Sequence, residues 1–348
     1  MLAYIIVFIM SLVISLVFTP FVKKMAVGIG AVDLPNNRRI NKLPVPTLGG
    51  VAIYLGFSAA MFYNISISRL SLVIFLGGTF ILIVGIIDDL YEMSAHLKFF
   101  CQILAAAIPI LFSIKIDFIT NPISGGMIYL SHWGIPLTIL WIVSITNTVN
   151  LVDGLDGLAA GISAIAALTL FFVALQEGQI NAAVLSLALA GSALGFLKYN
   201  FHPAKIFMGD TGAMFCGYIL AVISVSGALK SAATVTLVVP VLALGVPILD
   251  TVFAIIRRIY NGKPIGEADH GHIHHSLLAL GFSQRQAVLG VYVISIFLGI
   301  TALIINGSDY NIALILLGFV LAVLIYGAWR IGIFSVEIPK EGTSLENN

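Results

Sequence analysis

Two adjacent carboxylates, Asp88 and Asp89, end the apolar run FLGGTFILIVGIIDD. Placing carboxylates at the end of a hydrophobic segment costs free energy unless solvent or a partner receives them. One interpretation is a helix terminus whose acidic side chains are solvated. The other is a site for Mg²⁺ or phosphate chemistry, because hard cations prefer carboxylate oxygens. The pair by itself does not decide between the two.

A second polar group lies in the segment TNTVNLVDGLDGLAAG, where Asn147, Asn150, Asp153 and Asp156 recur every three residues. On an α-helix this spacing drifts by about 60° per step, so neighbouring side chains share a face and the outer two do not. The alternative is a segment for helix packing and a turn. Packing alone would leave four polar side chains at a costly depth. We therefore predict a polar pocket.

Asp210 lies in YNFHPAKIFMGDTGA, at the predicted start of another apolar helix. Asp is a favoured N-cap residue, so helix capping is one interpretation. The other is a metal-binding carboxylate beside free backbone N–H groups, which favour phosphate. Lys205 would then contact phosphate, or its side chain would extend along the membrane interface.

Histidines cluster in the loop RRIYNGKPIGEADHGHIHHSLLALGFS. They are His270, His272, His274 and His275. A zinc site is one interpretation, but the cysteine ligands of a structural zinc site are absent, and a solvated loop is another. With Arg257, Arg258 and Lys263 nearby, we favour an anion site that receives a diphosphate. The basic segment NNRRINKLPVPTLGG is either a membrane anchor or part of the same site.

The amino-acid composition indicates that a membrane-embedded fold positions these residues. The chain of 348 residues is 59% hydrophobic and 9% charged, whereas an ordinary soluble domain is about 25% charged. A net charge of +1 gives no argument for a nucleic-acid partner. Cys101 and Cys216 lie in apolar segments and are expected to be small buried side chains rather than a disulfide.

We predict an all-α, polytopic membrane protein of about eleven transmembrane helices. The predicted spans are 2–22, 48–66, 70–87, 98–114, 135–151, 158–176, 180–198, 210–227, 232–256, 287–305 and 311–330. With the N-terminus outside and the C-terminus cytoplasmic, only Arg69, Lys115 and Lys230 of the 17 basic residues fall outside. The longest outer loop, 115–134, is expected to hold a short hairpin.

The carboxylates discussed above all fall on the cytoplasmic side of this topology, so we place the site there. Residues 1–335 are predicted to form one catalytic membrane domain, followed by a polar tail over 336–348.

Four motifs, IIDD, NTVNLVDGLDGLAAG, FMGDTGA and HIHH, resemble those of the polyprenyl-phosphate N-acetylhexosamine-1-phosphate transferases. The resemblance extends over roughly residues 1–330. It implies transfer of a sugar 1-phosphate from a UDP-sugar to undecaprenyl phosphate, with release of UMP and dependence on Mg²⁺, for which Mn²⁺ would substitute. The implied partners are the UDP-sugar, undecaprenyl phosphate and membrane lipid. The sequence leaves the oligomeric state open, with a homodimer as one alternative.

The polar-pocket argument and the resemblance together assign the site residues. The catalytic group comprises Asp88, Asp89, Asp153, Asp156, His274 and His275. The metal ligands are Asp210 and Asn150. The substrate-binding group comprises Lys42, Thr47, Lys98, Asn147, Asn200, Phe207, Arg257, Arg258 and His272.

The histidine motif bears on the donor sugar. The peptidoglycan branch of this family, the phospho-N-acetylmuramoyl-pentapeptide transferases, has three consecutive histidines after a proline, whereas this chain reads His272-Ile273-His274-His275. That form resembles the N-acetylglucosamine-1-phosphate branch, which we favour. Pro46-Thr47 is closer to the peptidoglycan branch, so that function is the alternative.

Two other classes of protein fit less well. A secondary transporter would place its charges near the midplane and commonly shows an inverted repeat, which we do not see. A non-catalytic scaffold would not need so many carboxylates at such depth.

Overall fold

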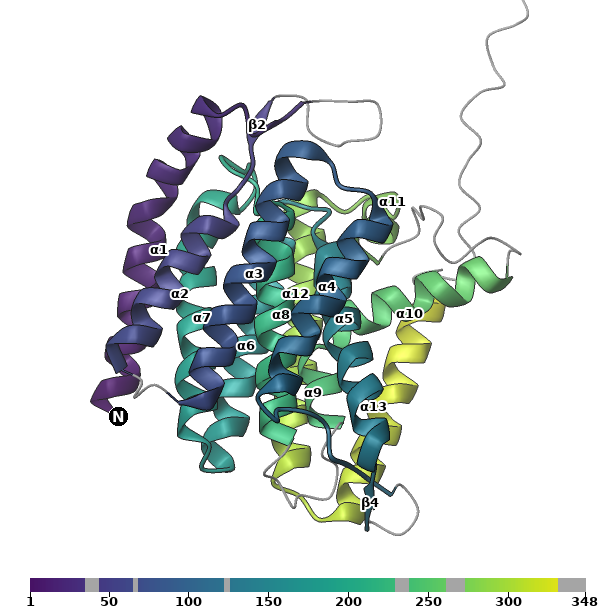
Figure 1. Ribbon diagram of the computed structural model, residues 1–348. Coiled ribbons are helices and arrows are strands. Elements are labelled where there is room, and N and C mark those ends of the chain that lie inside the picture. The colour runs from purple at the N-terminus through teal and green to yellow at the C-terminus, as the bar shows by residue number, and fades with distance from the viewer. Residues whose placement is uncertain (35–43, 65–67, 122–125, 229–237, 261–272, 331–348) are drawn as a thin grey trace, which may run out of the picture.

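The computed structural model describes residues 1–34, 44–64, 68–121, 126–228, 238–260 and 273–330, and shows a bundle of helices (Figure 1). The first eight helices are α1 (Leu2–Gly28), α2 (Gly50–Asn64), α3 (Arg69–Tyr91), α4 (Ala95–Leu111), α5 (Gly134–Val152), α6 (Leu158–Gln176), α7 (Ile180–Asn200) and α8 (Gly209–Ala228). The others are α9 (Val238–Ala243), α10 (Gly245–Tyr260), α11 (Ile273–Ala279), α12 (Gln284–Asn306) and α13 (Tyr310–Arg330).

The described strands form two short antiparallel pairs at opposite ends of the bundle (Figure 1). Strand β1 (Val32–Asp33) pairs with β2 (Val45–Pro46). Strand β3 (Phe118–Thr120) pairs with β4 (Met127–Tyr129) and is followed by a 3₁₀ turn, η1 (Ser131–Trp133). The second pair confirms the hairpin predicted in the loop 115–134.

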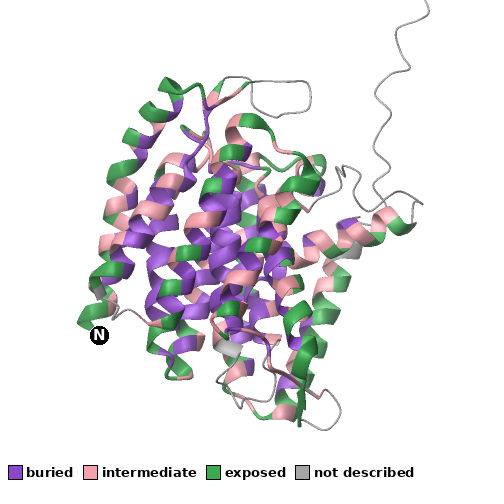
Figure 2. Cartoon of the chain, in the orientation of Figure 1, coloured by how far each residue is buried: buried purple, intermediate pink, exposed green. Residues whose placement is uncertain are grey.

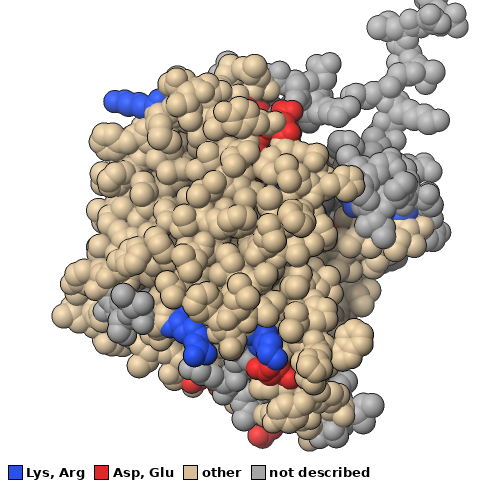
Figure 3. All heavy atoms as spheres, viewed as in Figure 1, with Lys and Arg blue, Asp and Glu red and all other residues tan. Residues whose placement is uncertain are grey.

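The outer surface of the bundle is apolar, as a lipid-facing surface must be. Eight helices in the described part of the chain are long and apolar enough to cross a membrane, and α2 and α4 are shorter apolar helices. Large side chains such as Ile9, Phe21, Ile315 and Phe319 are exposed on outward faces. Figure 3 shows an uncharged band with coloured charges near the two ends and beside α10. The prediction of an all-α polytopic membrane protein is confirmed, while the count of eleven crossings and their direction stay predictions.

The ninth predicted span, 232–256, is wrong as a continuous helix. Helix α9 ends at Ala243, α10 begins at Gly245, and α10 leaves the bundle sideways (Figure 1). Pro247 lacks a backbone N–H and fixes its own φ, so it suits the first turn of a new helix better than the middle of a long one. Gly245 packs against Leu298 of α12, where a Cβ would lie 2.6 Å from Leu298 Cδ1.

Helices α7 and α8 lie at the centre of the main core, where buried residues fill the interior of the bundle (Figure 2). A second core joins parts of α6, α9, α12 and α13. Cys216 is buried in α8 and Cys101 is partly buried in α4, and both are free thiols, as expected.

Glycines let two helices approach the start of α8. A Cβ on Gly50 of α2 would lie 2.2 Å from Gly212 Cα, and a Cβ on Gly85 of α3 would lie 2.5 Å from Thr211 Cα. Both distances are far inside van der Waals contact, so only glycine fits at either position. This close packing brings the end of α3 against the first turn of α8.

Candidate active site

The predicted carboxylates meet at one end of the bundle, where α3 and α5 end and α4 and α8 begin. The first turn of α8 is capped by a residue of another helix. Asp89 of α3 accepts hydrogen bonds from Asp210 N (2.9 Å), Thr211 N (3.0 Å) and Thr211 Oγ1 (2.5 Å). A helix start leaves N–H groups unpaired and carries partial positive charge, so a carboxylate stabilises it. Asp89 therefore joins α3 to α8.

The contacts of Asp89 bear on both interpretations of Asp210, the helix N-cap and the carboxylate beside free N–H groups. Asp210 lies inside the first turn of α8 and donates its own N–H to Asp89, so it is not the N-cap. The expectation of free N–H groups for phosphate is wrong at Asp210 and Thr211, because the Asp89 carboxylate accepts both. The side chain of Asp210 remains available for other contacts.

Lys98 of α4 lies among three oxygen atoms from three other helices. Its Nζ is 2.7 Å from Asp88 Oδ2, 2.9 Å from Asp210 Oδ1 and 3.1 Å from Asn150 Oδ1. Asn150 Nδ2 also donates to Asp210 Oδ1. We call these four residues the Lys98 cluster. It unites the predicted metal ligands with one carboxylate of the adjacent pair.

Asp88 is fixed from a second side. Its Oδ1 accepts the N–H of Met93 (2.8 Å), just beyond the end of α3, where Glu92 adopts a left-handed conformation with φ of 50°. Asp88 is only 7% exposed. Its carboxylate is thus held towards Lys98 by the turn that joins α3 to α4.

Asp153 follows the last residue of α5 and is half-buried. Burial, and after it the negative charges of Asp210, Asp89 and Asp156, raise the pKa of the Asp153 carboxyl to about 8. A carboxyl in such surroundings binds a proton at neutral pH unless additional positive charge is supplied. The site therefore has more negative charge than Lys98 alone neutralises.

The donor set of this cluster fits Mg²⁺. Mg²⁺ binds oxygen, and protein sites commonly provide one or two carboxylates while water and substrate phosphates complete the shell. Asp210, Asn150 and Asp88 offer two carboxylates and an amide oxygen, and these oxygens converge on the Lys98 ammonium. Among the described residues, no three His, Cys, Asp or Glu side chains group closely enough to hold a metal ion on their own. The donor types therefore suit Mg²⁺, while the position at their centre is held by Lys98.

Asp156 and Asn200 hold the loop that precedes Asp210. Asp156 Oδ2 accepts from Ala204 N (3.0 Å) and is 2.8 Å from His202 Nδ1. Asn200 accepts from Gly157 N (3.1 Å) and donates to Ile206 O (3.0 Å). Both side chains are buried. These contacts support a positioning role, and the predicted catalytic and substrate-binding roles of the two residues stay predictions.

Asn147 pairs with a residue that sequence reasoning missed. Its Nδ2 donates to Gln102 Oε1 (2.5 Å), and Gln102 Nε2 donates back to Asn147 Oδ1 (3.2 Å). Gln102 is buried in α4, one helical turn after Lys98. That i, i+4 spacing was the available signal, since it places Gln102 on the same helix face as Lys98. The pair joins α4 to α5 directly behind the Lys98 cluster.

Thr47 lies beside Asp89. Gly209 has φ of 71°, and a Cβ there would lie 2.4 Å from both Thr47 Oγ1 and Asp89 Oδ2. Thr47 is 8% exposed, and within the described part of the chain its Oγ1 has no hydrogen-bond partner. An unpaired buried hydroxyl costs free energy, so this oxygen is well placed to bond a substrate group.

Phe207 is positioned by the segment that carries Thr47. Phe207 N donates to Pro46 O (2.8 Å), and Gly49 N donates to Phe207 O (2.9 Å). The chain before α2 and the chain before α8 thus run side by side at the edge of the site.

The remaining predicted residues are only partly described. Lys42 and His272 lie outside the described residues. Arg257 and Arg258 are in the last turn of α10. His274 and His275 belong to α11, whose first residue, Ile273, donates its N–H to Asp250 Oδ1 (2.7 Å). Asp250, a buried residue that the sequence analysis did not single out, thereby joins α10 to the histidine helix.

Comparison with known proteins identifies the family. The model of glycosyl transferase family 4 matches residues 71–228. A probable undecaprenyl-phosphate N-acetylglucosaminyl 1-phosphate transferase of Bacillus subtilis (strain 168) is 43% identical over 348 residues, which cover 100% of this chain and 94% of the relative. The chain belongs to glycosyl transferase family 4.

Two further relatives are less similar. A decaprenyl-phosphate N-acetylglucosaminephosphotransferase of Mycolicibacterium smegmatis is 36% identical over 81% of this chain and 77% of the relative. An undecaprenyl-phosphate alpha-N-acetylglucosaminyl 1-phosphate transferase of Yersinia pestis is 26% identical over 96% of this chain and 94% of the relative. The predicted resemblance is confirmed: the protein is an enzyme of the sugar-phosphate transferase class, not a transporter or a scaffold. The segment matched by the family model contains the whole Lys98 cluster.

Proposed function

We propose that this enzyme transfers N-acetylglucosamine 1-phosphate from UDP-N-acetylglucosamine to undecaprenyl phosphate, giving undecaprenyl-diphospho-N-acetylglucosamine and UMP. The observation that carries the proposal is the 43% identity to the Bacillus subtilis relative over the full chain. The Lys98 cluster supports it, because its mixture of carboxylates and an ammonium group suits phosphate chemistry at a membrane.

The acceptor needs little activation. A phosphate monoester with a second pKa near 6 is mostly dianionic at neutral pH. An oxygen of the lipid phosphate attacks the β-phosphorus of the donor, and the bond from that phosphorus to the oxygen shared with UMP breaks, so UMP leaves with the electron pair. The main task of the site is to bring two anions together and to orient them.

Asp210 and Asn150, with Asp88, would hold Mg²⁺. When bound, the ion neutralises charge on the diphosphate as it develops in the transition state. Lys98 binds the same carboxylates and supplies positive charge to the phosphates. Thr47 offers a hydroxyl that has no hydrogen-bond partner among the described residues, and Asp89 keeps the first turn of α8 in place. A dependence on Mg²⁺ is part of this proposal.

We favour a direct single displacement. Asp88 is buried, ion-paired with Lys98 and bonded to Met93 N, which suits a carboxylate that orients its neighbours and assists the lipid phosphate. A covalent phospho-sugar intermediate on this residue would require that ion pair to be given up. Isolation of such an intermediate after incubation with donor alone would contradict the single displacement.

We place the reaction at the cytoplasmic face. The support is the positive-inside distribution, because the site end of the bundle also carries Lys23, Lys24, Lys198 and Lys205.

The donor is tested with a panel of UDP-sugars, purified protein and undecaprenyl phosphate. We expect UMP release and a lipid product of the mass of undecaprenyl-diphospho-N-acetylhexosamine with UDP-N-acetylglucosamine. Turnover of UDP-N-acetylmuramoyl-pentapeptide, with none of UDP-N-acetylglucosamine, would favour the peptidoglycan alternative and leave the family unchanged.

A further inference from the structure

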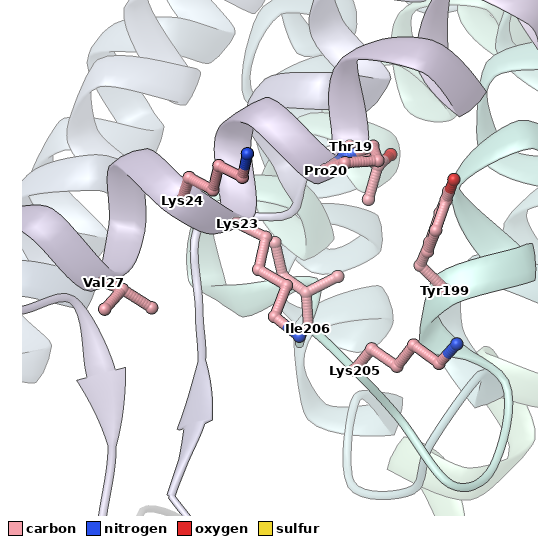
Figure 4. Close-up of a pocket in the computed structure, with 8 residues that line it drawn as sticks. All are labelled: Thr19, Pro20, Lys23, Lys24, Val27, Tyr199, Lys205 and Ile206. Atoms are coloured by element: carbon pink, nitrogen blue, oxygen red, sulfur yellow. The ribbon is translucent and has the colours of Figure 1, made fainter.

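A pocket of about 470 Å³ lies at the site end of the bundle, between the last turns of α1 and the segment that joins α7 to α8 (Figure 4). Its charged lining residues are Lys23, Lys24 and Lys205, and no Asp or Glu of the described part of the chain lines it. Tyr199, Val27 and the buried Ile206 complete much of its wall. The pocket shares no residue with the Lys98 cluster. It is therefore a second cationic feature, beside the segment that carries Asn200 and Phe207.

The lining combines positive charge with apolar surface. Lys23 extends from α1 towards Ile206, while Lys205 extends beneath Tyr199 on the other side of the pocket (Figure 4). The lining thus carries three positive charges, which attract an anion. A lysine ammonium binds phosphate as a point charge, without a demand for one geometry. The pocket thus suits a phosphate-bearing group attached to something apolar.

The surroundings of the pocket face lipid. In register with the pocket lining on α1, Val13, Val17 and Val27 are 44%, 49% and 55% exposed, although they are apolar. Such residues are stable at the surface only where hydrocarbon covers them. Acyl chains would contact this apolar surface while a headgroup enters among the lysines, as basic residues at a membrane interface attract anionic lipids. A soluble anion would use the lysines and leave the apolar surface unexplained.

We propose that this pocket binds the phosphate headgroup of an anionic glycerophospholipid. The acceptor undecaprenyl phosphate is also an anionic lipid, but it must reach the Lys98 cluster, and none of the pocket residues belongs to that cluster. The pocket is instead suited to a lipid that stays bound beside the enzyme.

Native mass spectrometry of the purified full-length protein in detergent tests the proposal with phosphatidylglycerol and phosphatidylcholine. We expect one saturable binding site for phosphatidylglycerol and no equivalent binding of zwitterionic phosphatidylcholine. The double variant Lys23→Gln/Lys205→Gln should lose roughly 25-fold in phosphatidylglycerol affinity, from about fivefold for each basic residue near an anionic lipid. Val27→Trp, which fills the pocket and keeps every lysine, should also weaken binding.

The matched control is Lys115→Gln/Arg330→Gln, which removes the same charge away from the pocket and should retain wild-type affinity. Equal helix content and monodisperse elution establish that each variant is folded. Equal losses in both double variants, or equal binding of the two lipids by the wild type, would overturn the proposal. So would lysine-dependent binding of inorganic phosphate without lipid, which indicates a soluble anion. Displacement of phosphatidylglycerol by equimolar undecaprenyl phosphate would assign the pocket to the acceptor and likewise overturn it.

Discussion

At the scale of single residues, the two adjacent carboxylates serve different partners. Neighbouring side chains on an α-helix point about 100° apart, so Asp88 and Asp89 cannot share one direction. Asp88 faces Lys98, and Asp89 faces the backbone of α8. The motif therefore combines a charge partner of the reaction centre with a connection between two helices. Substitutions at the two positions should therefore impair the enzyme for different reasons, at Asp88 through the reaction centre and at Asp89 through the contact between α3 and α8.

Asp210→Asn should abolish most of the activity. The amide removes one negative charge from the Lys98 cluster and from the proposed metal site, so we expect the turnover rate to fall about a hundredfold or more. UMP release measured against Mg²⁺ concentration checks this. Asp117→Asn, which removes an exposed carboxylate paired with Lys115 elsewhere, is the control. A variant that keeps its rate and its Mg²⁺ dependence would show that Asp210 is not a metal ligand.

His274→Ala should impair turnover and leave folding intact. We assign the histidine helix α11 to the donor diphosphate or the sugar, so loss of the imidazole should lower kcat/KM by roughly tenfold to a hundredfold. Initial rates at several donor concentrations and a thermal melt in detergent check both parts. His132→Ala, an exposed histidine in η1, should behave as wild type. Unchanged kinetics for His274→Ala would instead support the interpretation that the histidine loop is a solvated segment without a role in catalysis.

At the scale of secondary structure, the site depends on how α3 meets the first turn of α8. Asp89 supplies the cap, and Gly85, one turn earlier in α3, permits the close approach. The same first turn carries Asp210. A change at this helix contact should therefore affect stability and catalysis together.

Asp89→Asn should destabilise the protein as well as slow it. An amide keeps one acceptor oxygen but presents N–H groups to other N–H groups, so we expect a loss of about 1–2 kcal/mol, the usual range for a helix cap. Thermal unfolding in detergent measures the loss. Thr211→Val, which removes only the hydroxyl bond to Asp89, should cost less. Equal melting temperatures for wild type and Asp89→Asn would argue against a structural cap.

Gly85→Ala tests the close approach itself. The added methyl group would lie 2.5 Å from Thr211 Cα, so the helices must separate, at a cost of about 1–3 kcal/mol. We expect a lower melting temperature and lower activity. Gly318→Ala in α13 is the matched control, because no atom lies within 4 Å of the added Cβ. A normal melting temperature for Gly85→Ala would show that this contact is looser than described.

Hydrophobic length predicted most of the elements. Ten of the eleven predicted spans overlap one helix each, because an apolar run long enough to cross a bilayer has few alternatives to helix. Hydrophobic length did not predict the break at Gly245. The break depends on Pro247 and on a close contact with Leu298, and hydropathy contains no information on either. The residue types of the site were predictable, but their partners were not. Nothing local in the sequence relates Asp89 to the backbone of α8, or Asn147 to Gln102, because these contacts join helices far apart in the chain.

At the scale of the whole molecule, the two ends of the bundle differ in charge. Among the described basic residues, Arg69 and Lys115 lie at the end opposite the site, while Lys23, Lys98 and Lys205 lie at the site end. Basic residues collect on the cytoplasmic side of membrane proteins. This asymmetry predicts an orientation for the bundle and, with it, the compartment from which the donor is taken.

Cysteine labelling in intact cells tests that orientation. In a background of Cys101→Ser and Cys216→Ala, we expect Asp309→Cys, in the exposed turn between α12 and α13, to react with a membrane-impermeant maleimide. His96→Cys, exposed in the first turn of α4 beside the site, should react only after the membrane is permeabilised. Retained activity of each variant after solubilisation shows that the labelled protein is folded. The physical reason is that reversing the bundle would place most of its lysines and arginines on the outer side, against the bias that fixes membrane topology. The opposite labelling pattern would place the reaction centre outside, where UDP-sugars made in the cytoplasm could not reach it. That result would contradict the proposed orientation but not the helix packing.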